Sequence, residues 1–211
     1  MRYHSAIAAT IGAAAVVRAT PPTNDHGIRS ELHEGYKIEP LAWRGVIEKG
    51  GPEFSFNGTV DEVTRQIQAV KTDFTWESLR RDLGISNTLL RERGGKAGII
   101  CDIGGEDTSP HGPLTANVEE SRDKIEEMAG TCAVAAGPGV CSVVACTRNA
   151  AVWLCNDNDA PIAPPCSSLA SYVTDIVGKC GLEYYHGSRH CKGQEFDSDN
   201  FNVVVGWNSQ C

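Results

Sequence analysis

Hydrophobic and polar residues alternate from Glu53 to Asn57, as expected for a short strand with one buried face. The residues that follow predict an amphipathic helix. Thr59 and Glu62 have the spacing of a capping box, and apolar residues then recur along one helical face at Val63, Ile67, Val70 and Phe74. A second short helix is predicted from Trp76 to Leu83, because Gly84 is a typical helix end.

The second half of the chain also contains both strand-like and helix-like patterns of apolar residues. Short apolar runs predict strands, and two segments with apolar residues on one side predict helices, the first through Leu114, Val118, Ser121, Ile125 and Met128 up to Gly130. The predicted strands are 97–101, 141–146 and 151–155, the second helix is 167–179, and the segments 194–196 and 201–207 form one last strand or two. The order β-α-β-β-α-β is a split βαβ arrangement. We therefore expect an α+β fold, a two-layer sandwich of an antiparallel sheet with both helices on one face.

The N-terminus has the features of a secretory signal peptide over residues 1–19. A basic start precedes a 12-residue run of mostly small apolar residues, and Val17-Arg18-Ala19 resembles a cleavage site. Residues 20–96 would then form a linker and a small prosegment, released by cleavage at Arg80–Arg81 or near Arg93, or a permanently attached N-terminal subdomain. The sequence leaves both open. The cysteine-rich domain would span 97–211.

All nine cysteines lie within the last 111 residues of the chain, from residue 101 onward. This density predicts a disulfide framework in an oxidising compartment, and so an extracellular protein. A zinc site is not expected, because no C-x2-C pair exists and the closest spacing is Cys141-x4-Cys146. We expect no metal and no other cofactor. If the protein is secreted, Asn57-Gly58-Thr59 is an acceptor for N-glycosylation.

Charge separates the two halves of the chain and limits the partners. Residues 1–96 hold 13 Lys and Arg against 12 Asp and Glu, whereas residues 97–211 hold 6 against 15, and the total is −8. Nucleic acids and anionic membranes attract basic surfaces. We therefore expect neither as a partner, and no membrane insertion, since the apolar run is too short to span a bilayer.

No catalytic signature accompanies the framework. The serines at 167, 168 and 171 lack a G-x-S-x-G elbow, and loop histidines such as His186 and His190 are usually solvated. Residues 156–159 resemble a calcium loop but lack its glycine and distant glutamate. Trp153 and Trp207 lie on predicted strands, where they either fill the core or, exposed side by side, stack on a sugar. The chain is expected to be a binding protein and not an enzyme.

The succession from Cys166 to Cys180, followed by Gln194 and the strand Phe201–Trp207 closing on Cys211, resembles the C-terminal half of the smut-fungus killer toxin family. The resemblance covers about residues 98–211. It implies a small secreted, disulfide-bonded α/β sandwich, related to antifungal toxins that interfere with calcium channels and to secreted effectors of plant-associated fungi. The toxins are basic, have ten cysteines and carry a positive residue in the first hairpin strand. Here residues 142–145 are uncharged, so we do not expect this chain to block calcium channels as the toxins do.

The predicted hairpin would place Cys141 near Cys155. With the cysteine order of the resembling family, this suggests four disulfides and leaves Cys191 over for a bridge to a second copy. The expected pairs are Cys141 with Cys155, Cys146 with Cys166, Cys101 with Cys180, and Cys132 with Cys211. Eight cysteines alone allow 105 pairings, so spacing does not decide among them.

Together these features predict a secreted, non-enzymatic effector or killer-toxin-like protein. Its expected partner is a protein or glycan on a host or competing cell. The alternative is a carbohydrate-binding or cell-wall-associated module that uses exposed aromatic side chains.

Overall fold

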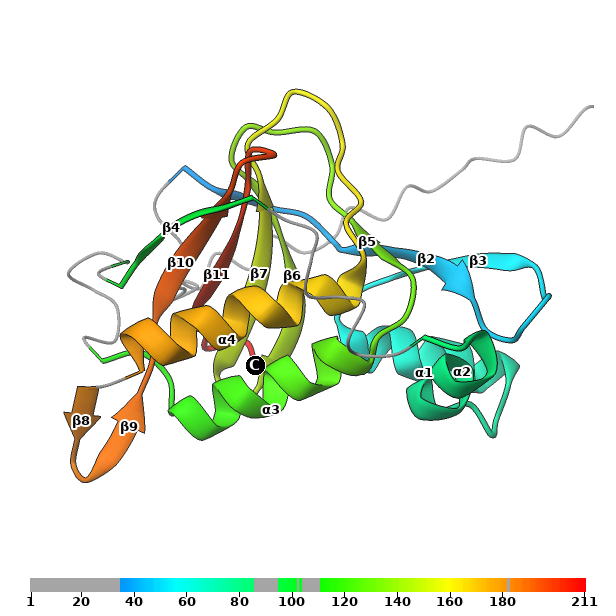
Figure 1. Ribbon diagram of the computed structural model, residues 1–211, viewed down its shortest axis with the longest axis horizontal. Helices are drawn as coiled ribbons and strands as arrows, with labels where there is room; N and C mark the ends of the chain where they lie inside the picture. The colour runs from blue at the N-terminus through cyan, green and yellow to red at the C-terminus, as the bar shows by residue number, and fades with distance from the viewer. Residues whose placement is uncertain (1–34, 86–94, 102, 104–110, 182) are drawn as a thin grey trace, which may run out of the picture.

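The computed structural model describes residues 35–85, 95–101, 103, 111–181 and 183–211. The predicted signal peptide at 1–19 and the cleavage position near Arg93 lie outside these residues. Within them the chain is a disulfide-bonded α+β sandwich with two main sheets and a separate two-stranded hairpin (Figure 1).

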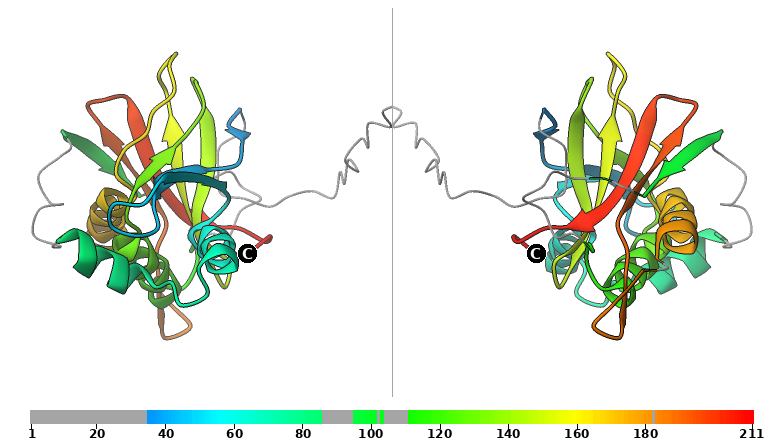
Figure 2. Two further views of the ribbon diagram at one scale, coloured as in Figure 1. Left: turned by 90° about the vertical axis from the view of Figure 1, so that its right-hand side faces the viewer. Right: turned by 90° about the vertical axis from the view of Figure 1, so that its left-hand side faces the viewer.

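The larger sheet has six strands in the order β1-β6-β7-β11-β10-β4. Neighbouring strands are antiparallel except for β1 and β6, which are parallel. The strands are β1 (Lys37–Ile38), β6 (Val140–Thr147), β7 (Ala150–Asn156), β11 (Phe201–Trp207), β10 (Gly193–Asp197) and β4 (Lys96–Ile100). Helices α3 (Thr115–Glu127) and α4 (Leu169–Cys180) cover one face, and the side views show the strands fanning out from them (Figure 2). The predicted sandwich is confirmed.

The β6–β7 hairpin forms where the sequence predicted it. Its two-residue turn is Arg148 and Asn149, which both have positive φ, at 45° and 71°. A two-residue turn in which both residues have positive φ has a backbone twist that matches the right-handed twist of the flanking strands. The register places Cys141 directly opposite Cys155, which is the pairing that hairpin geometry suggested.

A second sheet, in the order β3-β2-β5, combines the two halves of the chain. Strands β3 (Glu53–Asn57) and β2 (Ala42–Val46) come from the N-terminal part, and β5 (Thr131–Ala133) comes from the cysteine-rich part. Helices α1 (Val60–Val70) and α2 (Trp76–Leu83) pack beside this sheet. The capping box of α1 is present: Thr59 and Glu62 exchange backbone and side-chain hydrogen bonds. Strands β1, β2 and β5 were not predicted, nor were the two strands of the separate hairpin, β8 (Glu183–Tyr185) and β9 (Ser188–His190).

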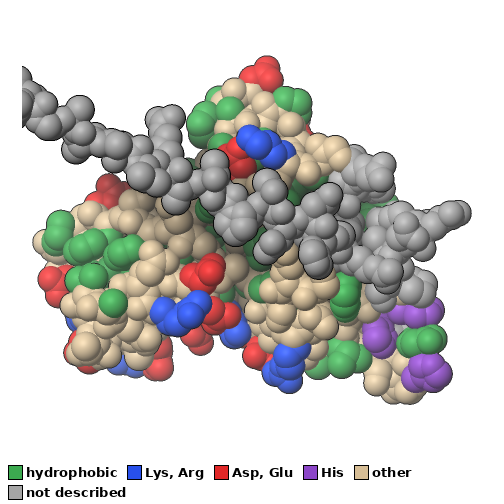
Figure 3. Space-filling model, turned by 180° about the vertical axis from the view of Figure 1, so that it is seen from behind, with side chains coloured by type: hydrophobic (Ala, Val, Ile, Leu, Met, Phe, Trp, Pro, Cys, Tyr) green, Lys and Arg blue, Asp and Glu red, His purple; other side chains and the backbone are tan. Residues whose placement is uncertain are grey.

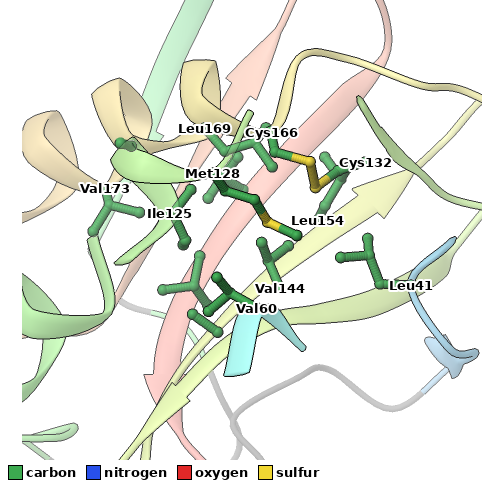
Figure 4. Close-up of a cluster of buried hydrophobic side chains, with 14 of the residues drawn as sticks. Leu41, Val60, Ile125, Met128, Cys132, Val144, Leu154, Cys166, Leu169 and Val173 are labelled. Carbon is green, nitrogen blue, oxygen red and sulfur yellow. A yellow bond between two sulfur atoms is a disulfide. The ribbon is translucent and has the colours of Figure 1, made fainter. Parts of the chain in front are cut away.

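The N-terminal residues share one hydrophobic core with the sandwich. Leu41 and Val60 lie in the same cluster as Val144 and Leu154 of the larger sheet (Figure 4). At the proposed cleavage site Arg80–Arg81, Arg80 lies within α2, is only 7% exposed, and donates to the Glu126 carbonyl. Residues 35–85 are therefore part of the packed body. That they are released by cleavage stays a prediction.

Two of the four expected disulfides are confirmed and two are wrong. The structure pairs Cys101 with Cys180 and Cys141 with Cys155 as expected, but it pairs Cys132 with Cys166 and Cys146 with Cys211. The places of the four cysteines in the core explain the exchange. Cys132 and Cys166 are buried in the main core, where the Cys132 amide bonds to Pro164 (Figure 4). Cys146 and Cys211 pack on the opposite face, in a smaller cluster around Trp153.

Candidate recognition surfaces

A short hairpin projects from the end of the sandwich near α3 and α4 (Figure 1). It consists of β8 (Glu183–Tyr185) and β9 (Ser188–His190). Its turn, His186 and Gly187, has φ values of 49° and 80°, the left-handed conformation that suits a tight two-residue hairpin. The base is anchored to the body, because the Arg189 Nε donates to the Gly181 carbonyl at 2.8 Å. The hairpin is therefore held in a defined position.

Three imidazole rings surround one exposed tyrosine on this hairpin. Tyr185 is 43% exposed, and the ring of His111 stacks on it with centroids 4.0 Å apart. His186 approaches edge-on at 4.2 Å, and His190 lies 5.9 Å away. The histidines gather at this end of the molecule when it is viewed from behind (Figure 3). We call Tyr185, His111, His186 and His190 the aromatic cluster.

The aromatic cluster combines an apolar ring with hydrogen-bonding groups. His190 uses its Nδ1 for the Gly112 carbonyl at 2.9 Å, which fixes that ring. Exposed tyrosines that are held rigidly are well suited to recognition, because they offer a large contact area with little loss of side-chain freedom. Sequence reasoning treated His186 and His190 as solvated loop residues and missed Tyr185 and His111. The turn sequence His186-Gly187 after two tyrosines was the available signal.

A cleft of about 720 Å³ lies where the N-terminal elements meet the larger sheet. It is bounded by the β1–β2 connection, the start of α1 and the C-terminal residues, and the C-terminus lies beside α1 (Figure 2). Its lining includes Ile38, Glu39, Asn57, Asp61, Asn208 and Gln210. The apolar floor includes Val143 and the Cys146–Cys211 disulfide.

The acidic side chains of the cleft already have partners. Asp61 lies 3.1 Å from the Lys124 Nζ, and Glu39 pairs with Lys37. Glu62 accepts from the Thr59 backbone at 2.8 Å in the capping box. Because these carboxylates are paired with cations or hydrogen-bonded, the cleft is suited to polar neutral groups at least as well as to a cation.

Trp153 and Trp207 do not form a joint stacking surface, so that possibility is wrong. Trp153 is 1% exposed and lies in the small cluster on the face away from the helices. Trp207 is half-buried and stands opposite Ala150, whose side chain belongs to the helix-side core. Side chains directly opposite each other on neighbouring strands share a face. The two tryptophans are therefore on opposite faces of the sheet.

A buried polar group lies between α4 and strands β10 and β4. The Tyr172 hydroxyl donates to Asp197 at 2.5 Å, and the Lys96 Nζ lies 4.8 Å from the centre of the Tyr172 ring. Glu195 is 3% exposed, and its Oε2 has no hydrogen-bond partner in the structure, with Lys96 Nζ at 4.0 Å. Burial raises the pKa of Glu195 to about 7, although Lys96 opposes the shift. Burial and then the bond to Asp197 raise the pKa of Tyr172.

The calcium-like segment 156–159 has a structural role. The Asn156 amide donates to the carbonyls of Ala135 and Ala160, both at 2.8 Å, and Asn158 donates to the Asp199 carbonyl at 2.9 Å. These side chains therefore join three loops. Among the described residues, no group of three or more His, Cys, Asp or Glu side chains is placed to hold a metal ion.

The ninth cysteine, Cys191, lies outside the four disulfides and is buried. It is 1% exposed, and its Sγ is 3.9 Å from the Ile176 carbonyl of α4. A disulfide to a second copy would require this part of the core to open.

Comparison with family models, with curated proteins and with solved structures gives no match for this chain. The class of protein therefore follows from the fold alone: a cysteine-rich α+β sandwich with four disulfides, as suits an extracellular environment. Among the helices that the structure describes, none is long and apolar enough to cross a membrane.

Proposed function

We propose that this chain is a secreted, non-enzymatic effector or killer-toxin-like protein that recognises a protein or glycan on a host or competing cell. The observation that carries the proposal is the aromatic cluster. An exposed tyrosine among three imidazoles adds nothing to the core, yet the hairpin that presents it is anchored and has a tight turn. Such rings are the side chains that dominate binding energy at interfaces.

The contacts of the titratable side chains support the proposal that the protein is not an enzyme. His190 bonds to a backbone carbonyl, and His186 packs against Tyr185, so both rings serve the hairpin. Glu195 has the raised pKa that is typical of catalytic acids, but it is buried away from both the aromatic cluster and the cleft lining.

The test is the binding of labelled protein to intact fungal and plant cells. Tyr185→Ala should weaken binding about tenfold, the loss typical of an aromatic interface residue. Val70→Ala is the matched control, because Val70 is a 59% exposed hydrophobic residue on α1, away from the hairpin. Equal binding by both variants would refute recognition by the hairpin. Growth inhibition of a competing fungus that is reversed by calcium would favour the toxin-like role.

The carbohydrate-binding alternative is supported by the same exposed ring. Tyr185 offers a stacking surface, and the imidazoles beside it offer hydrogen bonds to hydroxyl groups. Chitin, β-glucan and cellulose in a pull-down would distinguish this role. Retention on one polysaccharide, lost in Tyr185→Ala, would assign the cluster to a glycan, whereas retention on none would leave a protein target.

A further inference from the structure

Asn57 is one of the residues that line the cleft. It is the last residue of β3 and belongs to the exposed face of that strand with Glu53 and Ser55. Its backbone is fixed, because its carbonyl accepts from the Gln66 side chain at 2.8 Å and the next amide, of Gly58, bonds to the Leu41 carbonyl at 2.9 Å. A group attached to this side chain would begin at the cleft and from a defined point.

The cleft has the lining that a sugar needs. Asn208 and Gln210 provide amides, Glu39 and Asp61 provide carboxylates, and these planar polar groups hydrogen-bond hydroxyls well. The floor offers apolar contact through Val143 and the Cys146–Cys211 disulfide. The volume of about 720 Å³ is within the range of small-ligand sites.

The exposure of Ile38 is consistent with a covering group. This residue lines the cleft and is 51% exposed, although it lies in a strand of the larger sheet. A tethered occupant needs little intrinsic affinity, because attachment gives an effective concentration in the millimolar range. The cleft therefore does not require the stacked aromatic rings of a site for free sugars.

We propose that the cleft is occupied by the first sugars of an N-linked glycan on Asn57 of the same chain. This inference rests on the secretion that the proposed function includes. In the covalent step, the Asn57 side-chain nitrogen bonds to the first sugar carbon of a lipid-pyrophosphate-linked oligosaccharide. The bond from that carbon to the pyrophosphate breaks, and the lipid pyrophosphate and a proton leave. The glycan then covers Ile38 and closes the surface between α1 and the C-terminal residues.

The experiment measures how fast a peptide-N-glycosidase removes the glycan from the native protein. A control glycan is placed outside the cleft on the Asn57→Gln background: Asp73→Asn forms a sequon with Phe74 and Thr75, on an exposed residue that does not line the cleft. Thr59→Ser keeps both the natural sequon and the helix cap. We expect mass spectrometry to find the glycan in wild type and Thr59→Ser, with native removal at least tenfold slower at Asn57 than at position 73, and equal rates after unfolding.

The outcomes separate this inference from the proposed function. A glycan on Asn57 that is removed from the native protein as fast as the control overturns the seated glycan and leaves secretion and recognition untouched. An Asn57 that carries no glycan in a glycosylating host overturns the inference as well, while cell binding that depends on Tyr185 would still support recognition.

Discussion

The Trp43 indole donates a hydrogen bond to the Ala129 carbonyl at 2.7 Å, across 86 residues of sequence. Trp43 lies on β2 and is fully buried, and Ala129 follows α3 of the cysteine-rich part. Gly130 makes the approach possible: a Cβ there would come within 2.7 Å of the Trp43 Nε1. Although no cysteine ties residues 35–85 to the rest, this contact and the shared second sheet integrate the two parts.

Trp43→Phe should lower the free energy of unfolding by about 1–3 kcal/mol, because the buried Ala129 carbonyl loses its donor and the smaller ring leaves space. Urea unfolding followed by circular dichroism measures the change, with Val70→Ala as an exposed control that should shift the midpoint little. If Trp43→Phe unfolds at the wild-type midpoint, the two parts are not coupled as the structure indicates.

The disulfide map provides a second test. Proteolysis of the non-reduced protein should yield peptides that link Cys132 to Cys166 and Cys146 to Cys211. In the chain-entropy model, removing either bond lowers stability by about 4 kcal/mol, because the separations are 34 and 65 residues. Cys132→Ala with Cys166→Ala should be the more damaging pair, since both residues are fully buried. Recovery of a Cys132–Cys211 peptide would contradict the fold.

Glu195 makes stability depend on pH. Its pKa in the folded protein, about 7, lies above the ordinary value of 4.5, so the folded state favours the protonated carboxyl. This stabilisation is complete below about pH 4.5 and is lost as the pH rises through 7; it amounts to about 3 kcal/mol. Glu195→Gln should therefore be more stable than wild type at pH 8 and similar at pH 4.5. If the free energies of unfolding of the wild type and the variant differ by the same amount at both pH values, Glu195 does not titrate in this way.

Burial of Cys191 leads to a prediction about the oligomeric state. Because its side chain is 1% exposed and packs against α4, we expect the protein to run as a monomer in non-reducing electrophoresis. Cys191→Ser should leave that mobility unchanged. A dimer that disappears in Cys191→Ser would restore the intermolecular bridge that the odd cysteine count suggested.

Local sequence signals were sufficient for helices α3 and α4 and for every strand of the larger sheet except β1. The capping box at Thr59 and Glu62, and the two-residue turn at Arg148 and Asn149, act over a few residues, so they could be read directly. The same local geometry placed Cys141 opposite Cys155.

The choice of sheet neighbours was decided only by the tertiary structure. Strand β2 (Ala42–Val46) pairs with β3 nearby and with β5 nearly 90 residues later, and the second pairing leaves no periodic signal in the sequence. The partner of Cys146 depends on the face of the larger sheet that this residue occupies, and the partner of Cys132 depends on how β5 of the second sheet packs into the main core. Alternation along a strand shows that two faces exist but not which one faces the helices.

For the candidate site too, some features follow from the sequence and others only from the tertiary structure. The sequence by itself determined the cysteine content, the acidic charge, the sequon at Asn57, the four helices and most strands of the larger sheet. Only the tertiary structure brought His111 to Tyr185, buried Trp153 and placed Asn57 at the cleft, because each of these contacts joins segments that are far apart in the chain. Local propensities act within a helix or hairpin, whereas burial and proximity arise when the sheets and helices pack together.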